Sequence, residues 1–158
     1  MSDVYKRQVA EIVEAVRELL DRGLALVVYN APYDLSLLRH EAERYGVAPI
    51  LTPATVIDPL VLDKAVDRYR RGKRTLSAAA AHYDVALDAA HTAGADAVAA
   101  GRVAQALAER YPEQLGATAA ELHIRQVEWC RTQTANFEEY MRRTKDPAFT
   151  ASGAWPLR

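Results

Sequence analysis

The segment "VVYNAPYDLSLL" (residues 27–38) changes character within a few residues. It begins inside a continuous apolar run, "LALVVYN" (24–30), that is rich in β-branched residues. Such a run is typical of a strand that is covered on both faces inside a parallel sheet. An amide, a phenol and a carboxylate then follow, on Asn30, Tyr33 and Asp34. In open α/β sheets, ligands bind outside the carboxyl ends of the strands, so the pattern predicts a site here.

The rest of the chain predicts one more strand and several helices. The second strand is "ATVID" (54–58), which ends in Asp58. Apolar spacing, with Gly and Pro as stop signals, predicts helices over 9–22, 34–45, 59–71, 75–83, 92–110 and 117–143. The order predicts an α/β fold with two parallel strands joined by a right-handed crossover.

The last predicted helix carries a regular apolar stripe. Its members are Ile124, Val127, Thr134, Phe137 and Met141. Helical spacing of this kind predicts the buried face of an amphipathic helix. We expect Trp129 and Cys130, on the same helix, to be packing residues.

Length and composition limit the function classes without choosing among them. The 158 residues are enough for one domain, and the net charge of -1 neither supports nor excludes a nucleic-acid partner. The single cysteine cannot form an internal disulfide, which fits a reducing compartment. Because no segment approaches the roughly 18 apolar residues of a membrane span, we expect a cytoplasmic protein without a membrane partner.

A second group of polar residues lies in "HTAGADA" (91–97). Asp96 is surrounded in the sequence by alanines, so a helix over this segment offers no polar face on which its carboxylate would lie. Five positions along a helix place two side chains about 140° apart, so His91 and Asp96 converge only if His91 lies in the loop before the helix.

Together these residues resemble two motifs of the DEDDh 3′–5′ exonucleases, the family that includes the proofreading subunit of bacterial replicative DNA polymerase. The resemblance runs from about residue 9 to 110. The residues that match are Asn30, Tyr33 and Asp34 for the second motif, and His91 and Asp96 for the third. It implies a ribonuclease H-like fold, in which helices flank a mixed sheet of five strands.

The resemblance also implies a chemistry. In the family, four carboxylates hold two divalent ions, Mg²⁺ or Mn²⁺, for hydrolysis of a phosphodiester. Asp34 and Asp96 match two of these metal ligands, and His91 matches the histidine that takes a proton from the attacking water. Asn30 and Tyr33 are expected to contact the substrate. The implied partners are the single-stranded 3′ end of a nucleic acid, with DNA favoured over RNA, and a DNA polymerase.

The first motif of the family, Asp-x-Glu on the first strand, has no match in these residues. Residues 1–8, "MSDVYKRQ", have no signal-peptide core and run without a cap into the first predicted helix, and we expect them to be an adapter-derived leader. We expect 9–112 to be a truncated exonuclease domain that is inactive alone, and 113–158 a helical extension. Truncation also predicts an unpaired edge along residues 24–30 and an exposed apolar surface beside Asp34, because two strands alone make no stable sheet.

Other interpretations of the same residues stay open. Asp34 fits a helix N-cap as well as a metal ligand, His91 alone fits a loop histidine, and Asp96 fits a structural role. The basic run "RYRRGKR" (68–74) either contacts phosphates or forms a solvated loop. The competing function class is a non-catalytic ribonuclease H-like module that binds a polymerase or nucleic acid. An Asp-x-Glu strand upstream of Val9 would favour the enzyme.

Overall fold

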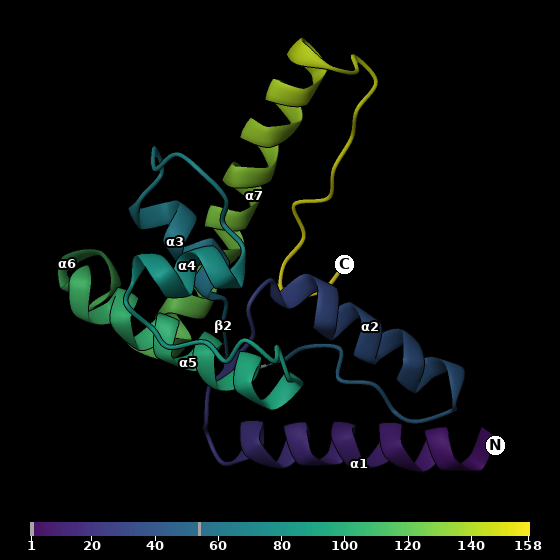
Figure 1. Cartoon of the computed structure of the whole chain (residues 1–158). Coiled ribbons are helices and arrows are strands. Elements are labelled where there is room, and N and C mark those ends of the chain that lie inside the picture. The colour runs from purple at the N-terminus through teal and green to yellow at the C-terminus, as the bar shows by residue number, and fades with distance from the viewer. Residues whose placement is uncertain (1, 54) are drawn as a thin grey trace.

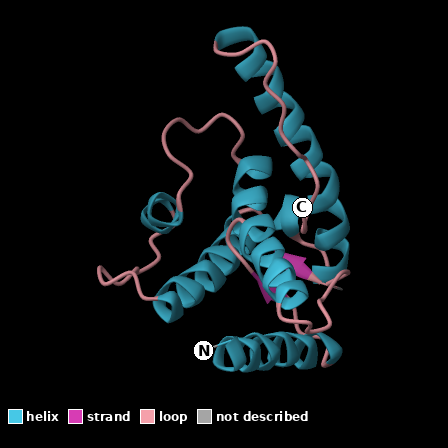
Figure 2. Cartoon of the chain, turned by 90° about the vertical axis from the view of Figure 1, so that its right-hand side faces the viewer, coloured by secondary structure: helices cyan, strands magenta, loops and turns pink. Residues whose placement is uncertain are grey.

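The computed structural model describes residues 2–53 and 55–158, and these are mostly helical (Figure 1). The elements in chain order are α1 Ser2–Asp21, β1 Leu26–Val27, α2 Ala31–Arg44, β2 Val56–Ile57, α3 Pro59–Val66, α4 Leu76–His82, α5 Ala93–Arg110, α6 Pro112–Leu115 and α7 Ala119–Thr144. β1 and β2 pair in parallel, with Leu26 opposite Val56. The predicted pair of parallel strands with flanking helices is therefore confirmed, and Figure 2 shows the pair lying among helices.

Both strands are shorter than the sequence predicts. The first ends at Val27, and Asn30, whose left-handed backbone (φ 60°, ψ 55°) comes three residues later, turns the chain directly into α2. A proline in the first turn of α2 suits that early start, because Pro is favoured where a helix begins. Ala54, the first residue of the predicted 54–58 strand, lies outside the described residues.

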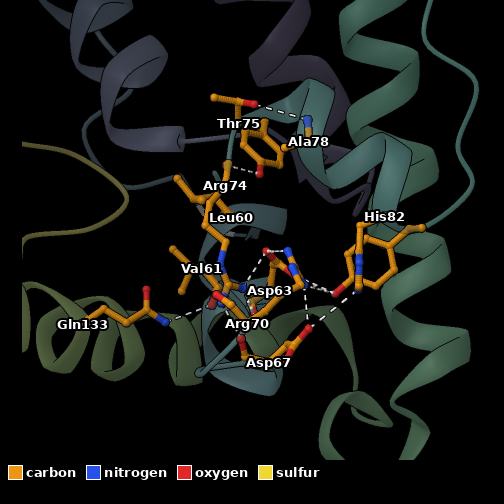
Figure 3. A network of polar contacts seen from close by, with 12 residues as sticks. Leu60, Val61, Asp63, Asp67, Arg70, Arg74, Thr75, Ala78, His82 and Gln133 are labelled. Atoms are coloured by element: carbon orange, nitrogen blue, oxygen red, sulfur yellow. Dashed lines mark hydrogen bonds and ion pairs between the residues drawn. The ribbon is translucent and has the colours of Figure 1, made fainter. Parts of the chain in front are cut away.

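α3 ends at Val66, five residues before the predicted end at 71, because the basic segment folds back on it (Figure 3). Asp63 is fully buried and accepts hydrogen bonds from Arg70 at 2.6 and 2.8 Å and from Arg74 at 2.9 Å. Tyr83 donates to the same carboxylate at 2.6 Å. Burial alone would raise the pKa of Asp63, but the hydrogen bonds from Arg70, Tyr83 and Arg74 hold it below its usual value. Two cations of the basic run are thus structural.

The predicted apolar stripe of the last helix is buried only in part: Val127 packs against the core cluster that contains Trp155, but two other members are exposed. Ile124 is 70% exposed and Phe137 is 51% exposed. The buried residues of α7 are Leu122, Gln126 and Cys130. Gln126 is polar and completely buried, so a search for apolar spacing could not find this face. The expected packing role of Cys130 and of the half-buried Trp129 is confirmed.

Side chains of α7 bind the edge of β2 that faces away from β1. The Val56 N–H donates to His123 Nδ1 at 2.9 Å, and the Val56 carbonyl accepts from Gln126 Nε2 at 3.0 Å. The Asp58 N–H donates to Gln126 Oε1 at 2.7 Å. A helix thus satisfies backbone groups that a neighbouring strand would otherwise pair.

The opposite edge of the pair belongs to β1, which has no further strand beside it within the described residues. Near Asp34, Leu37 is 53% exposed and Tyr33 is 70% exposed. The edge of β1 is thus free of a further strand among the described residues, as predicted, whereas an apolar surface left by a missing strand beside Asp34 stays a prediction. α1 is continuous from Ser2, so residues 3–8 are helical, and the division of the chain at residue 8 stays a prediction.

We predict that Gln126→Leu lowers the free energy of unfolding by about 2 kcal/mol or more. The substitution keeps the size of the side chain but leaves the Val56 carbonyl and the Asp58 N–H unbonded, and each buried orphan costs about 1–3 kcal/mol. Urea denaturation measures the change. Gln105→Leu, on the exposed side of α5, is the control and should stay within about 0.5 kcal/mol of wild type. Equal losses in both variants would contradict the edge role of Gln126.

We also predict that the protein becomes less stable as the pH is lowered, because His123 becomes protonated. Burial lowers the pKa of His123 below its ordinary 6.5, and Nδ1 can accept the Val56 N–H only when it is unprotonated. The unfolded chain therefore binds the proton more readily, so the contribution is present above pH 6.5 and is lost as pH falls through the lowered pKa.

The test for this prediction compares unfolding at pH 8 and pH 5. His123→Asn keeps an acceptor without a titrating ring and should lose less stability between the two pH values than wild type. His40→Asn, at an exposed position, should keep the wild-type difference. An unchanged pH dependence in His123→Asn would refute the assignment.

Candidate active site

Three predicted site residues share the start of α2. Asn30 is the N-cap residue, and Tyr33 and Asp34 lie in the first turn, with exposed side chains. No side-chain cap bond is made at this N-terminus by Asn30. Partial burial raises the pKa of Asp34 above its usual value. The structure therefore presents an amide, a phenol and a carboxylate, all exposed, at the start of one helix.

The turn that precedes α2 is held by the carboxylate of Asp58. Its Oδ1 accepts the Asn30 N–H at 2.9 Å, and its Oδ2 accepts the Ala31 N–H at 2.9 Å. The Leu60 N–H also donates to Oδ1, at 3.0 Å, so Asp58 caps α3 as well. Burial raises the pKa of Asp58, while these hydrogen bonds favour the ionised form. The sequence placed Asp58 at the strand end but did not reveal this role.

The C-terminal segment reaches the same carboxylate. After α7 the chain runs back beside that helix to α2, as both views show (Figures 1 and 2). There the buried Trp155 donates its indole N–H to Asp58 Oδ2 at 3.2 Å. The Arg158 N–H donates to Ser36 Oγ on α2 at 2.8 Å. The helical extension thus helps to position the turn at Asn30, which no local sequence pattern indicated.

The second predicted group assembles at the start of α5. Asp96 lies in the first turn, and Thr92 caps the helix through a bond from the Ala95 N–H. His91 lies before the helix with φ 47°, as expected, and its Nδ1 is 3.9 Å from Asp96 Oδ1. That distance is too long for a hydrogen bond, and Asp96 Oδ1 is buried without a partner among the described residues.

Backbone strain marks both groups. Among the described residues, three that are not glycine have positive φ, and two of these are Asn30 and His91. Such conformations cost about 1–3 kcal/mol each and cluster at functional sites. The strain therefore supports a functional interpretation of both turns.

The donor set fits divalent-ion binding only in part. The carboxylates of Asp34 and Asp96 are the hard oxygen ligands that Mg²⁺ and Mn²⁺ prefer, and the orphaned Asp96 Oδ1 suits a cation. Within residues 2–53 and 55–158, however, three His, Cys, Asp or Glu side chains do not gather anywhere as an ion site would need. The described residues thus supply single ligands and not a complete centre.

Comparison with known protein families supports the resemblance to exonucleases that the two motifs indicate. The exonuclease family of the ribonuclease T type matches residues 3–104, which include both groups of predicted residues. The chain belongs to this exonuclease family. The resemblance to the DEDDh exonucleases is therefore confirmed, and the family implies a ribonuclease H-like fold.

A curated relative of this exonuclease chain is the PolC-type DNA polymerase III of Lacticaseibacillus paracasei. The two are 34% identical over 96 residues, which are 61% of this chain and 6% of the relative. The chain thus spans a small fraction of that protein. No solved structure matches the chain significantly. None of the described helices is long and apolar enough to cross a membrane.

We predict that Asp58→Asn lowers the free energy of unfolding by about 1–3 kcal/mol. An amide has one acceptor oxygen, so its NH₂ group must face one of the backbone N–H donors and leave it unbonded. Thermal or urea unfolding measures the loss. The exposed Asp21→Asn is the matched control, expected within about 0.5 kcal/mol of wild type. A loss no larger than that of Asp21→Asn would show that Asp58 does not hold the turn.

Proposed function

We propose that this chain carries part of the active site of a 3′–5′ exonuclease that hydrolyses phosphodiesters at the single-stranded 3′ end of DNA, with RNA as the less favoured substrate. The observation that carries the proposal is the pairing of His91 with a buried, unbonded carboxylate oxygen of Asp96 at the start of α5. Membership of the exonuclease family supports it.

Each predicted residue has a distinct role in this proposal. Asp34 and Asp96 would supply two of the carboxylates that hold the divalent ions, Mg²⁺ or Mn²⁺, and these ions would supply charge stabilisation at the phosphate and a more acidic water. His91 would act as the general base that takes a proton from the attacking water. Its Nδ1 faces Asp96, which leaves Nε2 on the other side of the ring for the proton. Asn30 and Tyr33 contact the substrate.

Two carboxylates are too few for two divalent ions. The 158 residues contain no Asp-x-Glu. We propose that a segment outside residues 9–112 supplies this motif on the strand beside β1, that residues 1–8 are a leader, and that the chain alone is inactive. The open edge of β1 supports this arrangement. The name of the bacterial relative supports a DNA polymerase as partner.

The first test is cleavage by a longer gene product that includes an Asp-x-Glu strand upstream of Val9. With Mg²⁺ and single-stranded DNA or RNA, Asp34→Ala and Asp96→Ala should abolish digestion. His91→Ala should lower the rate by about 10²–10⁴, the range for loss of a general base. Asp88→Asn removes a charge from the exposed loop before His91 and is the control, expected to keep the wild-type rate.

Two outcomes would contradict the proposal. Wild-type rates of digestion by Asp34→Ala and Asp96→Ala would show that these two residues are not metal ligands of the active site. An upstream strand without Asp-x-Glu, together with nucleic-acid or polymerase binding but no cleavage, would identify the chain as a non-catalytic ribonuclease H-like module. For the chain alone, Mg²⁺-dependent digestion that Asp96→Ala removes would refute the expected inactivity.

A further inference from the structure

A cleft between α3 and α7 lies outside the residues that the exonuclease motifs use. It encloses about 490 Å³ and is lined by Lys64, Arg68, Trp129, Gln133, Asn136 and Phe137, among others. We call it the α3–α7 cleft. A second cavity of about 340 Å³ shares Lys64, Gln133 and Phe137 with it and extends to Asn30. The two cavities together connect the basic segment with the start of α2.

The cleft is positively charged although the chain as a whole is nearly neutral. Lys64 and Arg68 are exposed, and the ion pairs of this region use Arg70 and Arg74 instead (Figure 3). Among the described residues that line the two cavities, the one side-chain carboxylate is that of Asp58, which is 1% exposed and engaged by N–H donors. A cleft lined by one sign of charge concentrates ligands of the other sign.

Aromatic and amide side chains lie between these cations. Phe137 is held edge to face by Phe149, with 5.6 Å between ring centroids, and still exposes about half of its surface, 51%. Trp129, which also lines the cleft, is half-buried and packs against both core clusters. Proteins that bind single-stranded nucleic acid combine cations along the backbone with aromatic rings on which bases stack. An acidic peptide would use the cations but would leave the exposed ring of Phe137 without a stacking partner.

We propose that the α3–α7 cleft binds the single-stranded nucleic acid that precedes the 3′ end, with Lys64 and Arg68 on phosphates and Phe137 under a base. The inference rests on the proposed exonuclease function, because the cavity that continues the cleft reaches Asn30 in the substrate-contacting turn. The cleft then acts as the path by which the strand reaches the site.

The test measures binding without cleavage. Labelled oligothymidylate and oligouridylate of about 12 nucleotides, within the range of single-strand binding sites, are titrated with the 158-residue chain in EDTA, and fluorescence anisotropy gives the affinity. Lys64→Glu and Arg68→Glu should weaken binding and reduce the slope of log K against log salt by about 0.7 for each phosphate that the variant no longer neutralises. Phe137→Ala should weaken binding about 5- to 150-fold, with little change of slope.

Lys73→Glu is the matched control, because it makes the same charge change in the same basic run but lies outside the cleft. It should keep most of the affinity and the full salt slope. Thermal unfolding checks that each variant is folded, and Phe137→Leu replaces Phe137→Ala if the alanine variant is not. The oligothymidylate and oligouridylate arms show whether DNA or RNA is preferred.

Three results would overturn the inference: equal effects of Lys73→Glu and Arg68→Glu, no binding by the wild-type chain, or tighter binding of a labelled oligoglutamate peptide than of either oligonucleotide. The proposed function fails separately, through the cleavage assay. Cleft variants that lose binding while the longer gene product shows no Mg²⁺-dependent digestion would leave a nucleic-acid-binding cleft without the nuclease.

Discussion

The buried carboxylate of Asp58 connects three segments of this protein that are far apart in the sequence. It accepts N–H donors from the turn before α2, from the first turn of α3 and from Trp155 in the C-terminal segment. A buried carboxylate is costly unless hydrogen bonds satisfy it. The three segments therefore cannot separate without leaving a buried charge unbonded, which keeps the turn at Asn30 in place for Asp34, one helical turn further on.

The second constraint is the pairing of two very short strands. Two strands do not make a stable sheet alone, and here α7 takes part of the role of a neighbour by bonding the edge of β2 through His123 and Gln126. The edge of β1 has helices near it but no further strand within the described residues. The fold is thus closed on one side by a helix and open on the side where the ribonuclease H-like arrangement places its first strand.

Both groups of site residues follow from the same local device. α2 and α5 each begin directly after a residue with positive φ or one position beyond it, and each presents a carboxylate in its first turn. This geometry exposes Asp34 and brings His91 toward Asp96.

The cations of the basic run have two different roles. Arg70 and Arg74 stabilise buried Asp63, whereas Arg68 remains exposed at the α3–α7 cleft.

The sequence by itself determined the two parallel strands, most of the helices and the family resemblance, because apolar periodicity and a short motif are local properties of the chain. It also indicated that His91 must precede its helix, since helical geometry leaves no other way for it to meet Asp96. Only the tertiary structure decided that Gln126, and not the apolar stripe through Ile124, faces the core. It likewise decided that Trp155 reaches Asp58 across 97 positions of sequence. Both depend on backbone donors and acceptors of distant segments, whose need for partners is settled only when those segments pack together.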